Sequence, residues 1–244
     1  MKRVKTQNKA VLLLSGGMDS VTLLHWLARR VGAGNILALS FNYGQRHSRE
    51  LNSAAWQAHA VGVRKHEIVN VPFIGRMIGP ASVLTDPASA VPTLSSLPRA
   101  LRDQPPTYVP NRNMILLSLA AAFAESHGVT EVFYAAQAQD EYGYWDCTKA
   151  FVGRINRVLS LNRRKPARIK APFVGLSKAQ VLHKGLALGV DYAHTWSCYR
   201  GTAKPCGTCP SCTERLNAFR LCGKRDPLIG TLHRKTVKKP EESA

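Results

Sequence analysis

The feature that most constrains the fold of this chain is an abrupt passage from an aliphatic run into glycines, an acid and a hydroxyl. Val11–Leu14 form a short unbroken apolar run, which is typical of a strand covered on both faces. After the sequence SGGMDS, apolar residues recur at helical spacing up to Val31, and Gly32 ends the pattern. The chain is therefore expected to turn directly from a buried strand into a helix.

Such a turn offers a site for an anion. The first backbone N–H groups of a helix have no partner within it, and the positive end of the helix dipole lies at the same place. Gly16 and Gly17 allow the backbone to approach a phosphate closely, and Ser15 and Ser20 offer hydroxyl donors. Asp19 fits a phosphate site when Mg²⁺ compensates its charge. The alternative is a tight turn in which Asp19 only caps the helix.

Strands and helices alternate along the rest of the chain. ILALSF and HEIVNV are predicted strands, and a helix with apolar residues from Leu51 to Val61 lies between them. A helix in NRNMILLSLAAAFAESHG, the strand TEVFYAA and a late helix that begins near Ser177 continue this order. The order predicts an α/β fold with an open, mainly parallel, doubly wound sheet. Only the proline-rich residues 80–107 interrupt it, and they are expected to form a long loop or lid.

Polar clusters follow three of these strands: SGGMDS, NYGQRH and QAQDEYGYWD. In an open parallel sheet the carboxyl ends of the strands share one edge, where ligands bind. The three clusters are therefore expected to line one crevice.

A group of cysteines near the C-terminus has the spacing of a metal site: Cys198, Cys206, Cys209 and Cys212. Two C-x-x-C steps bring the thiolates of Cys206, Cys209 and Cys212 together, and the loop that precedes them brings in that of Cys198. This spacing is typical of tetrahedral Zn²⁺ in a structural role. An Fe–S cluster or a redox pair would use the same ligands, whereas the short spacings disfavour disulfides. Cys147 and Cys222 are expected to be ordinary thiols, although Cys147 lies in a crevice loop where a nucleophile would fit.

Composition bears on partners and location. A formal net charge of +19 in 244 residues favours phosphate-rich partners, either nucleotides or nucleic acid. The charge is concentrated in Arg154–Lys170, which contains no acid; nucleic-acid binding there is compatible with the charge but is not required, since no aromatic residues are interleaved. No apolar stretch is long enough to span a membrane and no signal-peptide pattern is present, so a soluble cytoplasmic protein is expected.

The length fits one α/β domain with a small appendage. The expected parts are a basic N-terminal tail over residues 1–9, a nucleotide-binding α/β domain over 10–195, a small zinc-binding loop region over 196–222, and a basic, frayed C-terminal tail over 223–244.

The sequence SGGMDS after a first strand resembles the pyrophosphatase loop of ATP-dependent adenylating enzymes, and no Walker-type string is present. Within that group, the strings FNYGQRH, YVPNRNMILLSLAA, YGYWDC and TWSCYRGTAKPCGTCPSCTERLNAF resemble the 7-cyano-7-deazaguanine synthase family of queuosine biosynthesis. The resemblance covers nearly the whole chain and implies an adenine nucleotide alpha hydrolase-like fold. Three departures are visible. That family usually has Asp where Asn42 stands, Gly where Asn111 stands, and a more glycine-rich start to the loop that here has the sequence AAQAQDEYGYWD.

The resemblance implies an ATP-dependent conversion of 7-carboxy-7-deazaguanine and ammonia into a nitrile, with AMP and pyrophosphate released. It also implies a homodimer, ATP and Mg²⁺ in the reaction and Zn²⁺ in the cysteine cluster. The residues expected to bind the nucleotide are Leu14, Ser15, Gly16, Gly17, Met18, Asp19, Ser20, Val21, Thr22, Leu23 and Leu24.

Catalytic roles are expected for Asp19, Arg112 and Lys178, the two cations neutralising charge on the leaving group. A helix cap or a carboxylate pair for Arg112, and a solvated helical position for Lys178, are the alternatives. The residues expected to contact the deazaguanine are Arg46, His47, Tyr144, Asp146 and, as a second choice for stacking, Trp145.

Two rival functions compete with this interpretation. A tRNA-modifying adenylating enzyme of the thiolating or lysine-attaching kind explains the basic surface more directly. A nucleotide-binding adaptor without turnover is the second rival, but the intact loop of serines, glycines and aspartate gives no reason to expect lost chemistry.

Overall fold

The computed structural model describes residues 9–94, 96, 104–138 and 143–230. Its centre is a five-stranded sheet in the order β3-β2-β1-β4-β5, in which every neighbouring pair is parallel. The strands are β1 (Ala10–Leu13), β2 (Ile36–Asn42), β3 (Lys65–Asn70), β4 (Glu131–Phe133) and β5 (Arg168–Lys170). The predicted open parallel sheet is confirmed.

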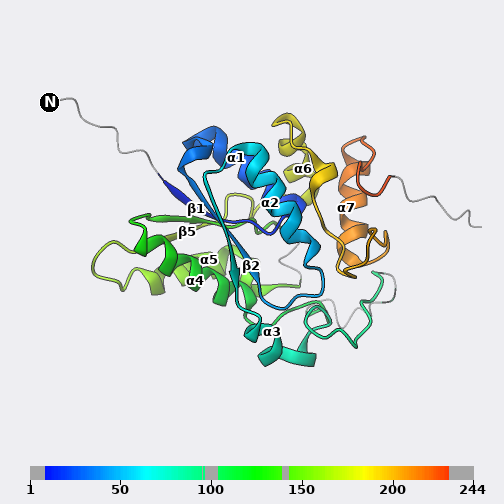
Figure 1. The fold of residues 1–244 in the computed structure, drawn as a ribbon, viewed down its shortest axis with the longest axis horizontal. Helices are drawn as coiled ribbons and strands as arrows, with labels where there is room; N and C mark the ends of the chain where they lie inside the picture. The colour runs from blue at the N-terminus through cyan, green and yellow to red at the C-terminus, as the bar shows by residue number, and fades with distance from the viewer. Residues whose placement is uncertain (1–8, 95, 97–103, 139–142, 231–244) are drawn as a thin grey trace, which may run out of the picture.

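Helices connect the strands and cover both faces of the sheet (Figure 1). They are α1 (Met18–Val31), α2 (Arg49–Val61), α3 (Phe73–Ile78), α4 (Arg112–Ser126), α5 (Lys149–Leu159), α6 (Lys178–Ala187) and α7 (Pro210–Leu221). Short 3-10 turns lie at Ala33–Asn35, Gly79–Ala81, Trp145–Cys147 and Tyr192–His194. None of the helices in the described part of the chain has both the length and the apolar character needed to cross a bilayer.

Two hydrophobic cores lie on opposite faces of the sheet. Val11 packs into the core that contains the buried residues of α4 and α5. Leu12, the next residue, packs into the core shared with α1, α2, α6 and α7. Successive strand residues point to opposite faces, so the unbroken apolar run of β1 supplies both cores at once. The sheet is therefore doubly wound, as the sequence predicts.

Several elements were not predicted from the sequence. Strand β5 and the second half of helix α5 lie in Arg154–Lys170, the segment singled out only for its charge. In α5 the buried Phe151 and Ile155 lie one turn apart, a helical spacing that the interpretation of the sequence overlooked. The expected zinc-binding loop region contains helix α7, which Pro210 begins at a position where its missing N–H costs nothing.

The segment after α7 also differs from the expected frayed tail. Asp226 is buried and receives two hydrogen bonds from the guanidinium of Arg215, at 2.8 and 2.9 Å. Ile229 is buried beside the cysteines. The chain is thus packed against the rest of the protein as far as these residues, and 231–244, like 1–8, lie outside the described residues.

The proline-rich segment 80–107 is a loop over its described part, with residues 95 and 97–103 outside it. Leu84 is fully buried in the core under α4, and Val91 packs beside the cysteines. The N–H of Val83 donates to the carbonyl oxygen of Pro106 at 2.9 Å, which ties the two ends of the loop together.

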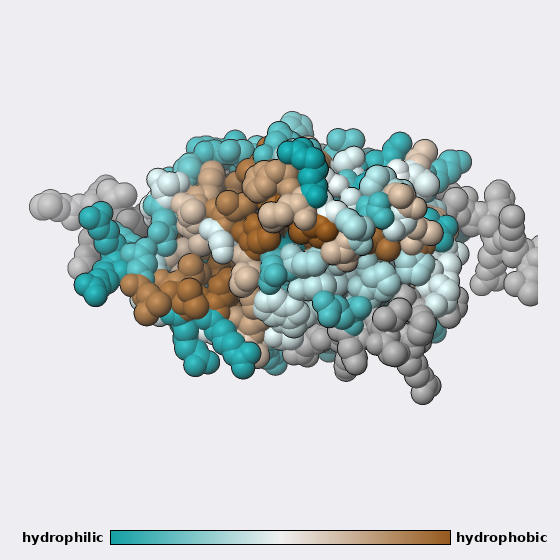
Figure 2. Space-filling view, turned by 90° about the horizontal axis from the view of Figure 1, so that it is seen from below, coloured by the Kyte–Doolittle hydropathy of each residue, from teal (hydrophilic) through white to brown (hydrophobic). Residues whose placement is uncertain are grey.

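Apolar side chains also gather on the outer surface on the side where α4 and α5 lie (Figure 2). The exposed large apolar residues of this region are Met114, Leu119, Val158 and Leu161. Exposed apolar surface of this kind often marks a contact with another protein.

Candidate active site

A cavity of about 280 Å³ lies at the carboxyl edge of the sheet. The segments that follow β1, β2 and β4 all line it, together with the start of α6 and parts of residues 196–215. The expected convergence of the three polar clusters on one crevice is therefore confirmed. Residues 139–142, which belong to the third cluster, lie outside the described residues.

The loop after β1 presents the start of α1 to the cavity. Leu14, Ser15 and Gly17 to Ser20 line it. The hydroxyl groups of Ser15 and Ser20 lie 3.0 Å apart, and that of Ser20 also donates to the carbonyl oxygen of Gly17 at 3.1 Å. Because the N–H groups in the first turn of α1 have no partner within the helix, the loop presents donors to the cavity.

The other residues of the predicted nucleotide stretch do not line the cavity. Val21, Leu23 and Leu24 are fully buried in the core behind the loop. Thr22 is also buried, and its hydroxyl bonds to the carbonyl oxygen of Met18 and to the hydroxyl of Tyr192. These positions of α1 therefore support the loop from behind.

Gly16 has a packing role of its own. Its φ is +84°, and a Cβ atom added there would lie 2.0 Å from the carbonyl oxygen of Glu50 in α2. We therefore expect Gly16→Ala to lower the free energy of unfolding by about 2–4 kcal/mol, since it combines backbone strain with a backbone clash. Gly62→Ala is the control, because φ is +83° there but no atom lies within 4 Å. Denaturant unfolding measures both, and equal losses in the two variants contradict the packing role.

Asp19 and Lys178 form a charged cluster with Glu214. The ammonium of Lys178 lies 2.7 Å from Oε2 of Glu214 and 3.8 Å from Oδ2 of Asp19. Lys178 is the first residue of α6, follows the N-cap Ser177 and is buried, so the solvated alternative is excluded. Burial raises the pKa of Asp19, although the Lys178 charge opposes this. Oδ1 of Asp19 is buried without a hydrogen-bond partner in the described part of the chain.

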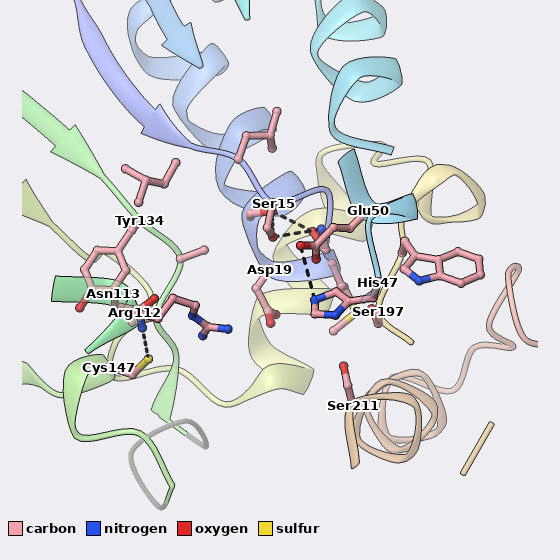
Figure 3. A pocket seen from close by; sticks show the side chains of 18 of the residues that line it. Ser15, Asp19, His47, Glu50, Arg112, Asn113, Tyr134, Cys147, Ser197 and Ser211 are labelled. Atoms are coloured by element: carbon pink, nitrogen blue, oxygen red, sulfur yellow. Dashed lines mark hydrogen bonds and ion pairs between the residues drawn. The ribbon is translucent and has the colours of Figure 1, made fainter. Parts of the chain in front are cut away.

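Arg112 reaches the cavity from the opposite side, at the start of α4 (Figure 3). Asn111 before it has φ of +54°, a left-handed conformation that Asn and Gly adopt readily. Although burial opposes the charge, the phenol groups of Tyr43 and Tyr199 and the carboxylate of Asp146 raise the pKa of Arg112 above its ordinary value. Arg112 is thus a permanent cation in the cavity wall.

In the segment after β2, the neighbouring residues Arg46 and His47, both expected to contact the substrate, lie in different places. His47 lines the cavity, and burial lowers its pKa to about 3, so its imidazole is neutral. Arg46 lies outside the lining, and its guanidinium donates to the carbonyl oxygens of Val83, Asp86 and Ser89, the last at 2.6 Å. In this conformation Arg46 holds the proline-rich loop.

Of the residues predicted to contact the substrate in the segment after β4, only some line the cavity. Tyr144 lines the cavity, and its hydroxyl lies 2.7 Å from that of Thr107. Asp146 is buried outside the lining and accepts a hydrogen bond from the N–H of Asn113 at 3.1 Å. Trp145 is about half exposed and donates to the hydroxyl of Tyr108, so it anchors the segment.

The four cysteines come together beside the cavity. Their sulfur atoms all lie within 4.8 Å of one another, and only Cys206 is partly exposed. The N–H of Trp196 donates to the carbonyl oxygen of Gly16 at 3.0 Å, which joins this region to the loop after β1. Ser197, Tyr199 and Ser211 line the cavity, so the region forms one of its walls.

Reasoning from the sequence missed several residues of the lining: Glu50, Asn113, Tyr134, Glu214 and Arg215. Glu50 is an acid within the otherwise apolar stripe of α2, three residues after His47, and that position is the signal that was overlooked. Glu214 and Arg215 lie two and three residues after Cys212 and were assigned to the zinc-binding region over residues 196–222. Arg215 is fully buried and also donates to the carbonyl oxygen of Tyr192.

The basic segment Arg154–Lys170 lies away from the cavity. It ends in β5, whose first residue, Arg168, marks the amino edge of the sheet, whereas the cavity lies at the carboxyl edge. Arg154, Arg157 and Arg163 are exposed. The concentration of charge in this segment is therefore separate from the candidate active site.

Comparison with known proteins identifies the family. The family model described as "Queuosine biosynthesis protein QueC" matches residues 9–223. The 7-cyano-7-deazaguanine synthase of Chromohalobacter salexigens is 46% identical over 222 residues, covering 91% of this chain and 85% of the relative. Those of Thermoplasma acidophilum and Marinobacter nauticus are 44% and 43% identical, each over 91% of this chain and over 92% and 96% of their own lengths. The chain therefore belongs to the QueC family of queuosine biosynthesis proteins.

Proposed function

We propose that the chain converts 7-carboxy-7-deazaguanine and ammonia into 7-cyano-7-deazaguanine at the expense of ATP. In the first half, the carboxylate attacks the α-phosphate of ATP, pyrophosphate leaves, and ammonia replaces AMP to form the amide. In the second half, the amide oxygen attacks another ATP, pyrophosphate leaves, and the C–O bond to AMP breaks as the nitrile forms. The oxygen of the amide thus departs on AMP.

One observation carries this proposal. The start of α1 lies in the same cavity as Arg112 and Lys178, two cations that enter from different elements. Donors of the loop after β1 would hold the departing pyrophosphate, and the cations would stabilise the charge that develops on it. A reaction that transfers an adenylyl group needs this combination of positioning and charge.

The wall opposite the α1 loop suits a planar heterocycle. Tyr134 and Asn113 lie on this wall (Figure 3), and Tyr144 also lines the cavity. The tyrosine rings would pack on the face of the deazaguanine, and the amide of Asn113 would face its polar edge. We assign Asp146 the task of holding Asn113, since its carboxylate is turned toward the backbone of that residue.

Two metal ions belong to the proposal. The four cysteine sulfurs fit Zn²⁺, because they are close enough to share one ion and Cys198, Cys209 and Cys212 are buried. Such an ion would staple the cavity wall without taking part in the reaction. Asp19 would hold Mg²⁺ with the ATP phosphates, since its Oδ1 is buried without a partner among the described residues. Mg²⁺ supplies charge neutralisation for the phosphates.

We further propose that the enzyme works in the cytoplasm as a homodimer. ATP and reduced thiols are both available in that compartment. The exposed apolar residues of α4 and α5 support a contact between two copies, which light scattering would detect as twice the mass of one chain. Nucleic-acid binding by the basic segment is not required for the reaction.

Product analysis tests the function directly. The protein is incubated with ATP, Mg²⁺, ¹⁵N-ammonium and 7-carboxy-7-deazaguanine, and we expect a nitrile that carries the label, with AMP and pyrophosphate formed in equal amounts. A reaction that needs tRNA, with steeply salt-dependent binding and no AMP from the free deazapurine, contradicts this function and favours the tRNA-modifying rival.

A further inference from the structure

The proposed reaction leaves protons on nitrogen that have to be removed. One proton leaves when ammonia displaces AMP from the adenylated acid. Two more leave when the adenylated amide, protonated on nitrogen after the amide oxygen has attacked ATP, loses AMP to become the nitrile. A base in the cavity accelerates such steps when it lies within reach of the nitrogen. This inference therefore rests on the proposed function.

Most charged groups of the cavity are unsuited to accept these protons. Asp19 and Glu214 share the ammonium of Lys178. Arg112 and Arg215 are cations and accept no proton. Glu50 is different, because within the described part of the chain no lysine or arginine nitrogen lies within 4.0 Å of its carboxylate. The contact recorded within that distance is with the neutral His47, at 3.5 Å.

The surroundings of Glu50 keep it in place while leaving it open to the cavity. Its Oε1 accepts a hydrogen bond of 3.1 Å from the side-chain amide of Gln45. That amide also donates to the carbonyl oxygen of Phe41 and accepts from the N–H of Tyr43, so its orientation is set by the backbone. The Glu50 side chain is 13% exposed and lines the cavity beside the loop after β1 (Figure 3).

We propose that Glu50 is the proton acceptor of the reaction. Its carboxylate takes a proton from the ammonia nitrogen as the C–N bond forms and AMP leaves. In the second half it takes one proton from the protonated amide nitrogen of the adenylated amide. It then takes the last proton from that nitrogen as the C–O bond to AMP breaks and the electron pair of the N–H bond enters the nitrile. Each proton passes to water before the next step, and the base is restored.

The electrostatics of the site agree with this role. Burial raises the pKa of Glu50 to about 7, although the hydrogen bond from Gln45 and the charge of Arg112 oppose the shift. The ionisable groups that face it are His47 and Tyr43 from the segment after β2 and Arg112 from α4. Burial lowers the pKa of His47 to about 3 and raises that of Tyr43, so neither exchanges a proton near neutral pH. A base is most effective when its pKa lies near the working pH.

The test separates proton transfer from adenylation. In Glu50→Gln we expect the exchange of labelled pyrophosphate into ATP, driven by 7-carboxy-7-deazaguanine without ammonium, to stay within about threefold of the wild type. Amide formation from preformed adenylate is expected to fall by about 100-fold or more. At a constant concentration of free NH3, wild-type activity rises with pH through about 7, because the base must be ionised, and this dependence is expected to disappear in the variant.

Two further variants complete the design. Glu50→Asp keeps the carboxylate but shortens the side chain by one CH2 group, which moves the carboxylate away from the cavity. We expect an intermediate rate of amide formation and a rate that still rises with pH through the pKa of the carboxylate. Glu67→Gln makes the same chemical change on β3, where the side chain is 48% exposed, and is expected to behave as the wild type. Amide formation at the wild-type rate in Glu50→Gln, or an equal loss of pyrophosphate exchange and amide formation, overturns the role of Glu50. A wild type that makes no adenylate overturns the proposed function instead.

Discussion

Asp19→Ala is expected to lower the rate of pyrophosphate release by about 100- to 1000-fold. The carboxylate lies at the start of α1 with Oδ1 buried and unpartnered within the described residues, a position suited to a cation that accompanies the phosphates. Its removal also deletes the ion pair of 3.8 Å between Asp19 and Lys178 and keeps the one of 2.7 Å between Lys178 and Glu214, so the ammonium is held less toward the α1 loop. A coupled assay of pyrophosphate measures the loss.

Asp191→Asn, which removes a carboxylate charge elsewhere in the chain, is the control for this change. Its carboxylate is 47% exposed and pairs with His194 away from the cavity lining, so wild-type rates are expected. Unchanged pyrophosphate release in Asp19→Ala contradicts the assigned role. Unchanged biological activity without pyrophosphate release favours the adaptor without turnover.

Cys209→Ser is expected to abolish metal binding and activity together. The thiolate of Cys209 belongs to both C-x-x-C steps, and the region that it holds forms a wall of the cavity. Structural zinc sites supply much of the folding free energy of small regions, so residues 196–222 are expected to lose at least several kcal/mol of stability. Metal analysis and amide hydrogen exchange over this region measure the two effects, and iron in place of zinc would favour the Fe–S alternative.

Cys222→Ser provides the control, since its thiol lies outside the quartet and contacts the carbonyl oxygen of Ala179 at 3.4 Å. We expect full metal content and near-normal stability in this variant. A Cys209→Ser protein that keeps its metal and its activity contradicts the structural role of the metal site.

The general architecture of the site could be predicted because it depends on chain order and periodicity. An unbroken apolar run, two glycines and a helical repeat are local features, and they define β1, the loop and α1 without reference to the rest of the chain. The parallel arrangement then brings the segments after β1, β2 and β4 to one edge. Strand β5 escaped prediction because three residues are too few to show a period. Helix α5 does show one, since Phe151, Ile155 and Leu159 recur at a spacing of four, and this signal was overlooked beside the charge of the segment.

Side-chain direction within the loops could not be predicted. Arg46 and His47 are neighbours, yet one bonds to the carbonyls of residues 83–89 and the other faces the cavity. Asp146, which is predicted to contact the substrate, accepts the N–H of Asn113. In both cases the deciding partner lies more than 30 positions away in the chain.

The sequence by itself determined the succession of strand, loop and helix, the edge of the sheet at which the polar segments meet, and the grouping of the four thiols. These features depend on hydrophobic periodicity, glycine conformation and ligand spacing, which act over short stretches of chain. Only the tertiary structure decided which polar side chains enter the cavity and how their charges are tuned. The burial that raises the pKa of Glu50, and the pairing of Lys178 with both Asp19 and Glu214, arise from groups that separate segments bring together, and short-range sequence patterns contain no measure of that burial.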